Sequence, residues 1–221
     1  MNDIYENDIL TTQQKDLLIL FSQSQLSSAF YLSGGTALSA CYLHHRLSED
    51  LDFFSDQDID VEIILSFLRS IPAIKDISYE RKYDRKLFLL QYQPEQILKI
   101  EFTRYPFERL APARKFGGVV VDSISDILAN KLMAMTDRRD PKDYVDVYFI
   151  LQDYPSLKIE DSIRQTENKF GIKGVSSILS GRFLEPPAIT GLSLRKQYND
   201  SEIKHFFQEI ARTLIRSSIG I

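Results

Sequence analysis

Two aspartates, Asp50 and Asp52, are separated by a single residue in the stretch EDLDFFS. The alternation of polar and apolar residues in this stretch predicts a strand. Side chains alternate between the two faces of a strand, so both carboxylates are expected on the same face. Two like charges this close repel each other unless a cation lies between them, and Mg²⁺ is suited to that position because it binds carboxylates together with phosphates. The alternative, which the pair alone favours, is an edge strand with a solvated acidic face.

A second predicted strand, ILKIEFTRY, supplies a candidate third carboxylate. Its apolar residues alternate with Lys99, Glu101 and Thr103, so Glu101 can face the same side of the sheet as the two aspartates. Three carboxylates on one face would offer the oxygen ligands that Mg²⁺ binds. Considered without its neighbours, Glu101 would instead be expected at the surface.

A glycine turn precedes the aspartates. Gly34 and Gly35 allow close approach of the backbone to a ligand, and Thr36 follows at the expected start of a helix. The Thr36 hydroxyl and the first free N–H groups of that helix could hold an anionic phosphate. The alternative is an ordinary strand-to-helix turn in which Thr36 is the N-cap.

Lys131 lies in the middle of the apolar face of a predicted helix. Lysine is rarely buried without a partner, so its side chain either extends past its neighbours to water or enters a cleft where it binds phosphate. Asp143 and Asp146 lie one turn apart on the next predicted helix. They could orient Lys131 or Arg138, contact a nucleotide, or form structural pairs with basic residues.

The overall charge limits the partners that the chain can bind. Its 221 residues include 27 Lys and Arg against 31 Asp and Glu, which gives a net charge of −4. Proteins that coat nucleic acid carry a general basic excess, so any nucleic-acid contact must be local. The stretches RKYDRK at 81–86 and RYPFERLAPARK at 104–115 are the candidates. Solvated charges on a hairpin and a loop are the alternative.

Cysteine content and hydropathy indicate a cytoplasmic protein. The single cysteine, Cys41, excludes an internal disulfide, and the residues after Met1 do not form a signal peptide. No apolar run approaches the roughly 18 residues that span a bilayer, so we expect no membrane contact. His44, His45 and His205 lack metal-ligand spacing and are expected at the surface or an interface.

Hydrophobic periodicity places the candidate residues on strands and helices. A helix is predicted over 12–23, a buried strand ends at Gly34, and a helix begins at Thr36. EDLDFFS then forms a strand, and DVEIILSFLRSIP forms a helix that Pro72 ends. Three further runs, DISYERKY, KLFLLQYQ and ILKIEFTRY, predict an antiparallel meander added to the first two strands.

From Ser123 the pattern changes to successive helices, beginning with SISDILANKLMAMTDR and DPKDYVDVYFILQDY. Further helices are predicted near 157–168 and 171–180, and an amphipathic helix follows them toward the end of the chain. The layout predicts two domains, a mixed α/β domain over 1–122 and a helical domain over 123–221.

Three stretches, GGTALSACYLHHRLSEDLDFF, LKIEF and ILANKLMAMTDRRDPKDYVDVYFIL, resemble the successive motifs of the AbiEii/AbiGii-type toxin nucleotidyltransferases. This family supplies the toxin half of bacterial toxin–antitoxin systems, within the DNA polymerase β-like nucleotidyltransferase superfamily. The resemblance covers roughly residues 30–151, and its specificity lies in the ordered combination of motifs. It implies an α+β fold: a nucleotidyltransferase-fold mixed sheet with flanking helices, followed by a helical C-terminal half that completes the active-site cleft.

The resemblance also implies roles for individual residues. The triphosphate would be bound by Gly34, Gly35 and Thr36. Asp50, Asp52 and Glu101 would hold Mg²⁺ or Mn²⁺, and Lys131 and Asp143 would complete the site, with Lys131 also binding the nucleotide. Arg46 and Ser48 match the family's Arg-x-Ser pattern and would steady the phosphates or the metal loop. Many superfamily members carry aspartate where this chain has Glu101, whose longer side chain can still reach a metal.

The activity that the resemblance implies is transfer of a nucleoside monophosphate from a nucleoside triphosphate to an acceptor hydroxyl, with release of pyrophosphate. The leading acceptor is tRNA, a cognate antitoxin is the expected protein partner, and the biological context would be growth arrest or phage defence. Two alternatives stay open. One is a nucleotide-binding or RNA-binding regulator without turnover, and the other is a nucleotidyltransferase that acts on a small molecule or a protein.

Overall fold

The structure is a computed structural model that describes residues 4–6 and 8–219. The chain divides into two compact units. The first contains the residues up to Tyr42, Leu47–Phe107 and Pro112–Asp122, and the second contains Leu43–Arg46, Glu108–Ala111 and the residues from Ser123. The sequence predicts a single boundary after residue 122, whereas two short segments from the first half pack with the helices of the second unit. Such long-range packing leaves no local pattern in the sequence.

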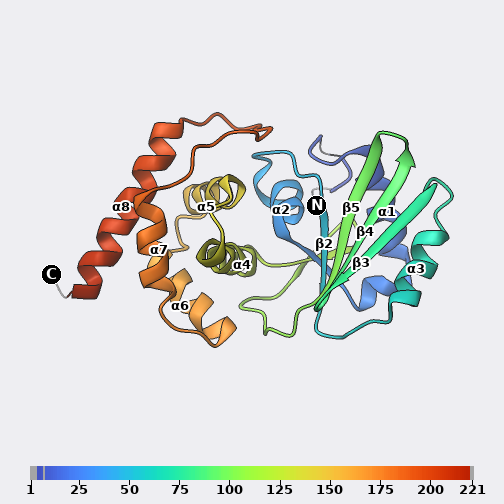
Figure 1. Cartoon of the computed structure of the whole chain (residues 1–221), viewed down its shortest axis with the longest axis horizontal. Coiled ribbons are helices and arrows are strands. Elements are labelled where there is room, and N and C mark those ends of the chain that lie inside the picture. The colour runs from blue at the N-terminus through green and yellow to red at the C-terminus, as the bar shows by residue number, and fades with distance from the viewer. Residues whose placement is uncertain (1–3, 7, 220–221) are drawn as a thin grey trace. The chain divides into compact units, whose positions relative to one another are not determined.

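Within the described residues the first unit forms a seven-stranded mixed sheet (Figure 1). Its strands are β1 (Tyr31–Ser33), β2 (Leu51–Ser55), β3 (Asp76–Lys82), β4 (Arg85–Gln93), β5 (Gln96–Arg104), β6 (Arg114–Phe116) and β7 (Val119–Val121). They lie in the order β3-β4-β5-β2-β1-β7-β6. The antiparallel meander of β3, β4 and β5 is confirmed. Because β5 pairs in parallel with β2, residues far apart in the sequence meet at this junction.

The hairpin of β6 and β7 is not predicted from the sequence. Each strand has only three residues, too few for an alternating pattern to be recognised. β7 pairs in parallel with β1 through Val121 and Leu32, and β6 forms the edge of the sheet. The basic stretch at 104–115 therefore runs from the end of β5 into an edge strand.

Two helices of the first unit cover one face of this sheet. The first unit contains α1 (Thr12–Gln23), a 3₁₀ turn η1 (Gln25–Ser28), α2 (Gly34–Leu38), a π-helical turn η2 (Ser39–Leu43) and α3 (Val61–Arg69). In Figure 1, α1 and α3 lie on the same side of the sheet. The Phe21 ring of α1 lies 4.3 Å from that of Phe53 in β2 and 6.3 Å from that of Phe67 in α3, measured between ring centroids. Asp52 precedes Phe53 in the same strand, so its side chain points to the opposite face.

The second unit is built from five described helices, α4 (Ile124–Asp137), α5 (Pro141–Asp153), α6 (Ile159–Phe170), α7 (Val175–Leu184) and α8 (Asp200–Ile219). In Figure 1, α7 and α8 lie side by side. The Phe207 ring of α8 contacts the rings of Phe183 in α7 and Tyr144 in α5. α6 and α7 begin later than predicted, and Gly171 and Gly174, both with positive φ, separate them. No helix in the ranges 4–6 and 8–219 is long and apolar enough to cross a membrane.

Candidate active site

Asp52 and Glu101 lie directly beside each other on the parallel strands β2 and β5. Residues in register on neighbouring strands share a face of the sheet, so both carboxylates lie on the face opposite to Phe53. Asp50 precedes β2 by one residue, and its carboxylate accepts a hydrogen bond of 2.6 Å from Nζ of Lys99 in β5. The junction of β2 and β5 therefore carries all three carboxylates that the sequence identifies.

Two basic side chains pair with two of the three carboxylates at this junction. Lys99 pairs with Asp50, and Arg85 of β4 donates two hydrogen bonds of 2.5 Å to Glu101. The Thr103 hydroxyl donates a third hydrogen bond, of 2.6 Å, to Glu101. Burial alone would raise the pKa of Glu101, but the hydrogen bonds from Arg85 and Thr103 outweigh it and hold this pKa below its usual value. Glu101 is therefore ionised at neutral pH.

The chemistry of this donor set fits Mg²⁺, because carboxylate oxygens are the ligands that the ion prefers. The positions of these donors fit the ion less well than their chemistry does. Among the described residues, no three His, Cys, Asp or Glu side chains are grouped closely enough to hold an ion. Lys99 and Arg85 supply the positive charge that an ion would otherwise bring to Asp50 and Glu101. An ion that binds all three carboxylates would therefore displace these two pairs.

Gly34 makes room for the Asp52 carboxylate. It follows β1 directly and has a φ of +71°, a conformation that residues with a Cβ atom rarely adopt. A Cβ atom at this position would lie 2.1 Å from Oδ2 of Asp52. The backbone of the glycine turn therefore lies directly against the carboxylate, and both the conformation and the available space require glycine.

Thr36 is not the N-cap of the helix that follows the turn. The alternative prediction of an ordinary turn capped by Thr36 is therefore wrong. α2 begins at Gly34, and Ser33 occupies the N-cap position. The fully buried Thr36 donates its hydroxyl proton to the carbonyl oxygen of Asp50, so it fixes the backbone that carries this carboxylate. The N–H groups of Gly34, Gly35 and Thr36 lie in the first turn of α2, where N–H groups have no intrahelical partner.

Gln14 supports the loop before Asp50, although the sequence identifies it only as part of a helix cap. Its Oε1 accepts a hydrogen bond from the N–H group of Thr11, which completes the expected capping box. Its Nε2 donates to the carbonyl oxygens of Ser48 and Glu49, at 2.9 and 3.1 Å. Because Gln14 is fully buried, it ties this loop firmly to α1. Ser48 is thus held through its carbonyl group.

In the second unit, Lys131 of α4 joins two aspartates of α5. Its Nζ lies 2.8 Å from Oδ1 of Asp143 and 2.7 Å from Oδ2 of Asp146, and Arg138 also pairs with Asp143. Burial alone would lower the pKa of Lys131, but the two carboxylates outweigh it and raise this pKa. Burial would raise the pKa of Asp146, yet Lys131 and Arg46 hold it well below its usual value. The aspartates therefore orient a charged lysine inside the helical core.

Arg46 also binds Asp146. Its Nε and Nη2 atoms donate to the two carboxylate oxygens, at 2.7 and 2.9 Å. A bidentate pair of this kind fixes both groups in position. Arg46 thus anchors the segment Leu43–Arg46 to α5, a role that the Arg-x-Ser resemblance does not imply.

His45 is expected at the surface or an interface, and this expectation is wrong. The side chain is fully buried, and its Nε2 lies 2.8 Å from Oδ1 of Asp146. Burial lowers the pKa of His45 despite this carboxylate, and its buried Nδ1 has no hydrogen-bond partner among the described residues. A neutral imidazole that donates from Nε2 satisfies both observations. The neighbouring His44 is exposed, so the sequence offers no sign of which histidine is buried.

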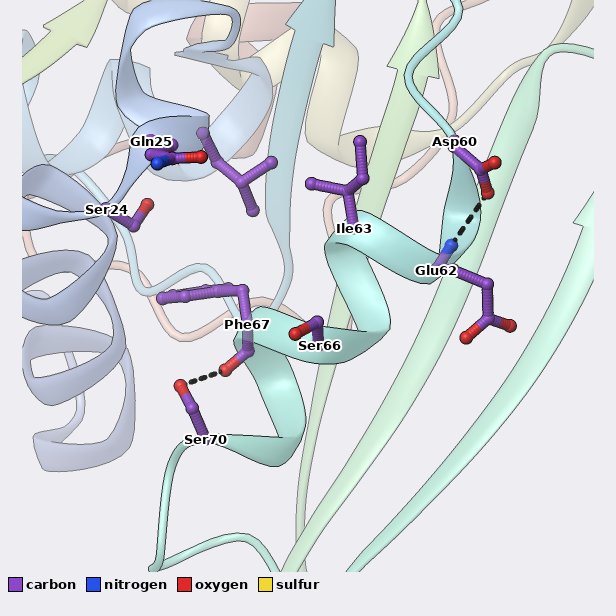
Figure 2. A pocket seen from close by; sticks show the side chains of 9 residues that line it. Ser24, Gln25, Asp60, Glu62, Ile63, Ser66, Phe67 and Ser70 are labelled. Carbon is purple, nitrogen blue, oxygen red and sulfur yellow. Dashed lines mark hydrogen bonds between the residues drawn. The ribbon is translucent and has the colours of Figure 1, made fainter.

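A pocket of about 520 Å³ lies between η1 and α3 in the first unit (Figure 2). Ile63 and Phe67 contribute its apolar surface. Its polar groups serve the ends of α3: Asp60 accepts from the N–H group of Glu62, and the Ser70 hydroxyl donates to the carbonyl oxygen of Phe67. The pocket lies on the helical face of the sheet, because Phe67 contacts the rings that cover this face. It is therefore separate from the carboxylates.

A protein-family comparison matches almost the whole chain. The family model described as "Nucleotidyl transferase AbiEii toxin, Type IV TA system" matches residues 16–216. An uncharacterised protein of Aquifex aeolicus is 29% identical to this chain over 147 residues, which cover 65% of this chain and 68% of that protein. The match includes every candidate residue from Gly34 to Asp146.

Solved structures share the fold. JHP933 from Helicobacter pylori is 19% identical, with a TM-score of 0.64 over 94% of each chain. MenT4, a nucleotidyltransferase toxin from Mycobacterium tuberculosis, is also 19% identical, with a TM-score of 0.57 over 92% of this chain and 82% of that chain. At this level of identity the likeness extends to the fold, which is that of a nucleotidyltransferase.

Proposed function

The chain belongs to the AbiEii nucleotidyltransferase toxin family, and on this premise we propose that it transfers a nucleoside monophosphate from a nucleoside triphosphate to an acceptor hydroxyl in a reaction that requires Mg²⁺. The observation that carries the proposal is the register of Asp52 with Glu101 on β2 and β5, with the backbone of Gly34 against the Asp52 carboxylate. Removal of any of these three groups would disturb the same carboxylate cluster.

Asp50, Asp52 and Glu101 would hold the ion. When bound, Mg²⁺ stabilises charge on phosphoryl oxygens and lowers the pKa of a hydroxyl that it contacts. The first-turn N–H groups of α2 would contact the phosphates, as helix N-termini do. Thr36 would keep Asp50 in position through the Asp50 carbonyl group. The contribution of the chain is thus mainly positioning and electrostatic stabilisation.

Lys131 would supply a positive charge for the phosphates, with Asp143 and Asp146 orienting it. A lysine ammonium has three N–H donors, and the contacts in the described part of the chain account for two of them. The remaining donor could bind a phosphate oxygen. This assignment is the one that the family resemblance implies for Lys131 and Asp143.

The proposed acceptor is RNA, with tRNA as the first to be tested, and the proposed location is the cytoplasm, where both substrates are present. The toxin family suggests a cognate antitoxin as partner, and we propose growth arrest or phage defence as the outcome.

A second candidate function is a regulator that binds nucleotide without turnover. It is favoured by the Lys99–Asp50 and Arg85–Glu101 pairs, which neutralise two carboxylates without an ion. A small-molecule or protein acceptor is the third.

The test incubates the protein with each α-labelled nucleoside triphosphate, Mg²⁺ and total bacterial RNA. The control is the double variant Asp50→Ala/Asp52→Ala, with its thermal unfolding measured alongside. The pair that Asp50 forms with Lys99 is partly exposed and contributes little to stability, so the variant is expected to fold and to transfer no label.

Label on RNA with the wild type alone would establish the transferase and identify the nucleotide. Label on protein or on a small molecule would change the acceptor. Tight nucleotide binding without transfer to any acceptor would favour the regulator. A variant that unfolds at a much lower temperature would assign the aspartates a structural role.

A further inference from the structure

The β3–β4 hairpin ends in an exposed tyrosine. Tyr83 and Asp84 form the two-residue turn between Lys82 and Arg85, which pair across the hairpin. Tyr83 has a φ of +54°, and 95% of its surface is exposed. Turn positions with positive φ favour Gly, Asn or Asp, and a bulky residue there is an outlier. The fold accommodates an unfavourable backbone conformation at Tyr83 and gains no burial from its ring.

The residues beside Tyr83 are mainly basic. The stretch RKYDRK contains four cations and one acid. Arg81 and Lys82 have half-exposed side chains, and their ion pairs, Arg81 with Asp58 at 3.6 Å and Lys82 with Glu80 at 3.2 Å, are exposed on both sides. Exposed pairs of this kind contribute little, so a phosphate can replace the carboxylate at small cost. The charges beside the ring are therefore available to a polyanion.

The hairpin tip is linked to the candidate site through the side chain of Arg85, although the tip lies beside the end of β2 and Asp50 precedes its start. Arg85, the first residue of β4, is in register with Thr103 and binds Glu101, two residues back along β5. Tyr83 is two residues from Arg85 along the chain. A strand that lies across Tyr83 would thus have to run along the sheet past Arg85 to reach the carboxylates of the first unit.

We propose that Tyr83 is a stacking platform for a base of single-stranded RNA, and that Arg81 and Lys82 hold the adjoining phosphates. RNA as the acceptor rests on the proposed function, whereas binding at the tip can be tested without it. An aromatic face beside cations is the usual means of binding single strands without sequence preference. A protein partner fits less well, because lysine is depleted in protein interfaces and the residues on both sides of Tyr83 in the chain are charged.

The binding test measures the fluorescence anisotropy of a labelled single-stranded RNA of mixed sequence. Tyr83→Gly is expected to weaken binding roughly 5- to 100-fold, and Tyr83→Trp to keep or increase the affinity. Glycine suits the positive φ, so the Tyr83→Gly protein should unfold at the same or a higher temperature than the wild type. Tyr198→Gly removes another exposed tyrosine, in the second unit, and should leave binding unchanged.

The transfer assay supplies a second readout. In Tyr83→Gly, the apparent KM for RNA should rise while the KM for the nucleoside triphosphate stays constant. The proposal is overturned if Tyr83→Gly binds RNA as tightly as the wild type, if Tyr83→Trp loses affinity to the same extent, or if the wild type binds no RNA. A wild type that binds RNA through Tyr83 and transfers no label would refute the transferase and leave the stacking site standing. A wild type that binds no RNA but transfers label to another acceptor would refute the stacking site and leave the transferase standing.

Discussion

A Cβ atom on Gly34 would lie 2.1 Å from Oδ2 of Asp52, so the glycine turn and the carboxylate occupy adjoining space. The relationship links β1 to β2 across the candidate site. It also explains why the Gly-Gly-Thr and Asp-x-Asp stretches belong together, although each is a weak signal alone.

Gly34→Ala should reduce nucleotide transfer by about 100-fold, because the new methyl group displaces the Asp52 carboxylate. The positive φ adds a destabilisation of about 1–2 kcal/mol. Initial rates and urea unfolding of the same preparation measure the two effects. Gly181→Ala is the control, since nothing lies within 4 Å of a Cβ atom there. Wild-type activity in Gly34→Ala would show that the position of Asp52 is not critical.

Lys131→Met should lower the free energy of unfolding by about 3 kcal/mol, because it leaves Asp143 and Asp146 buried without one of their cations. Urea unfolding measures the change. Lys142→Met, at an exposed position of α5, is the matched control and should change stability little. If Lys131→Met were as stable as the wild type but inactive, Lys131 would serve the substrate rather than the helical core.

The stability of the wild type should fall as the pH decreases below about 6.5, the usual pKa of histidine. Burial lowers the pKa of folded His45, so the unfolded chain takes up the proton at a higher pH than the folded protein does. Protonation then stabilises the unfolded chain relative to the folded protein. The contribution is complete above about pH 6.5 and is lost as the pH falls toward the folded pKa.

The comparison is with His45→Gln, whose side-chain amide can still donate to Asp146. This variant should lack the part of the pH dependence that arises from His45. Unfolding free energies between about pH 5 and 7.5 test this. The same slope in both proteins would mean that other groups cause it.

Arg85→Gln should lower the Mg²⁺ concentration needed for half-maximal transfer, by up to about fivefold. Arg85 competes with an ion for Glu101, and glutamine retains hydrogen bonding without the charge. The measurement is a Mg²⁺ titration at saturating RNA, with Lys75→Gln, at an exposed position before β3, as the control for loss of a positive charge. A higher Mg²⁺ requirement would indicate that Arg85 holds Glu101 in a productive position.

The sequence predicts the secondary structure well where patterns are local. The helix at 12–23 has the predicted bounds, and β3, β4 and β5 follow the alternation of apolar residues. The start of α2 is misplaced by two residues, because Gly34 is already helical and Ser33 takes the N-cap position. A residue pattern does not distinguish a glycine that ends a strand from one that begins a helix.

The partners of the candidate residues could not be predicted. The sequence places Glu101 on the face of the aspartates, and the register bears this out, but it gives no sign that Arg85 binds Glu101. The same is true of His45, whose burial depends on contacts with α5, about one hundred residues later in the chain. Periodicity indicates which side of an element is buried, whereas these pairs depend on how distant elements meet.

The segment Leu43–Arg46 bears on whether the helical half is a transferable module. A fragment that begins at Ser123 would contain Asp146 but neither His45 nor Arg46, the two donors that this segment supplies. Lys131 would then be the one remaining cation paired with the buried Asp146 carboxylate among the contacts described above. Exchange of the C-terminal halves between relatives would therefore have to include these four residues, even though they precede the Asp-x-Asp strand in the chain.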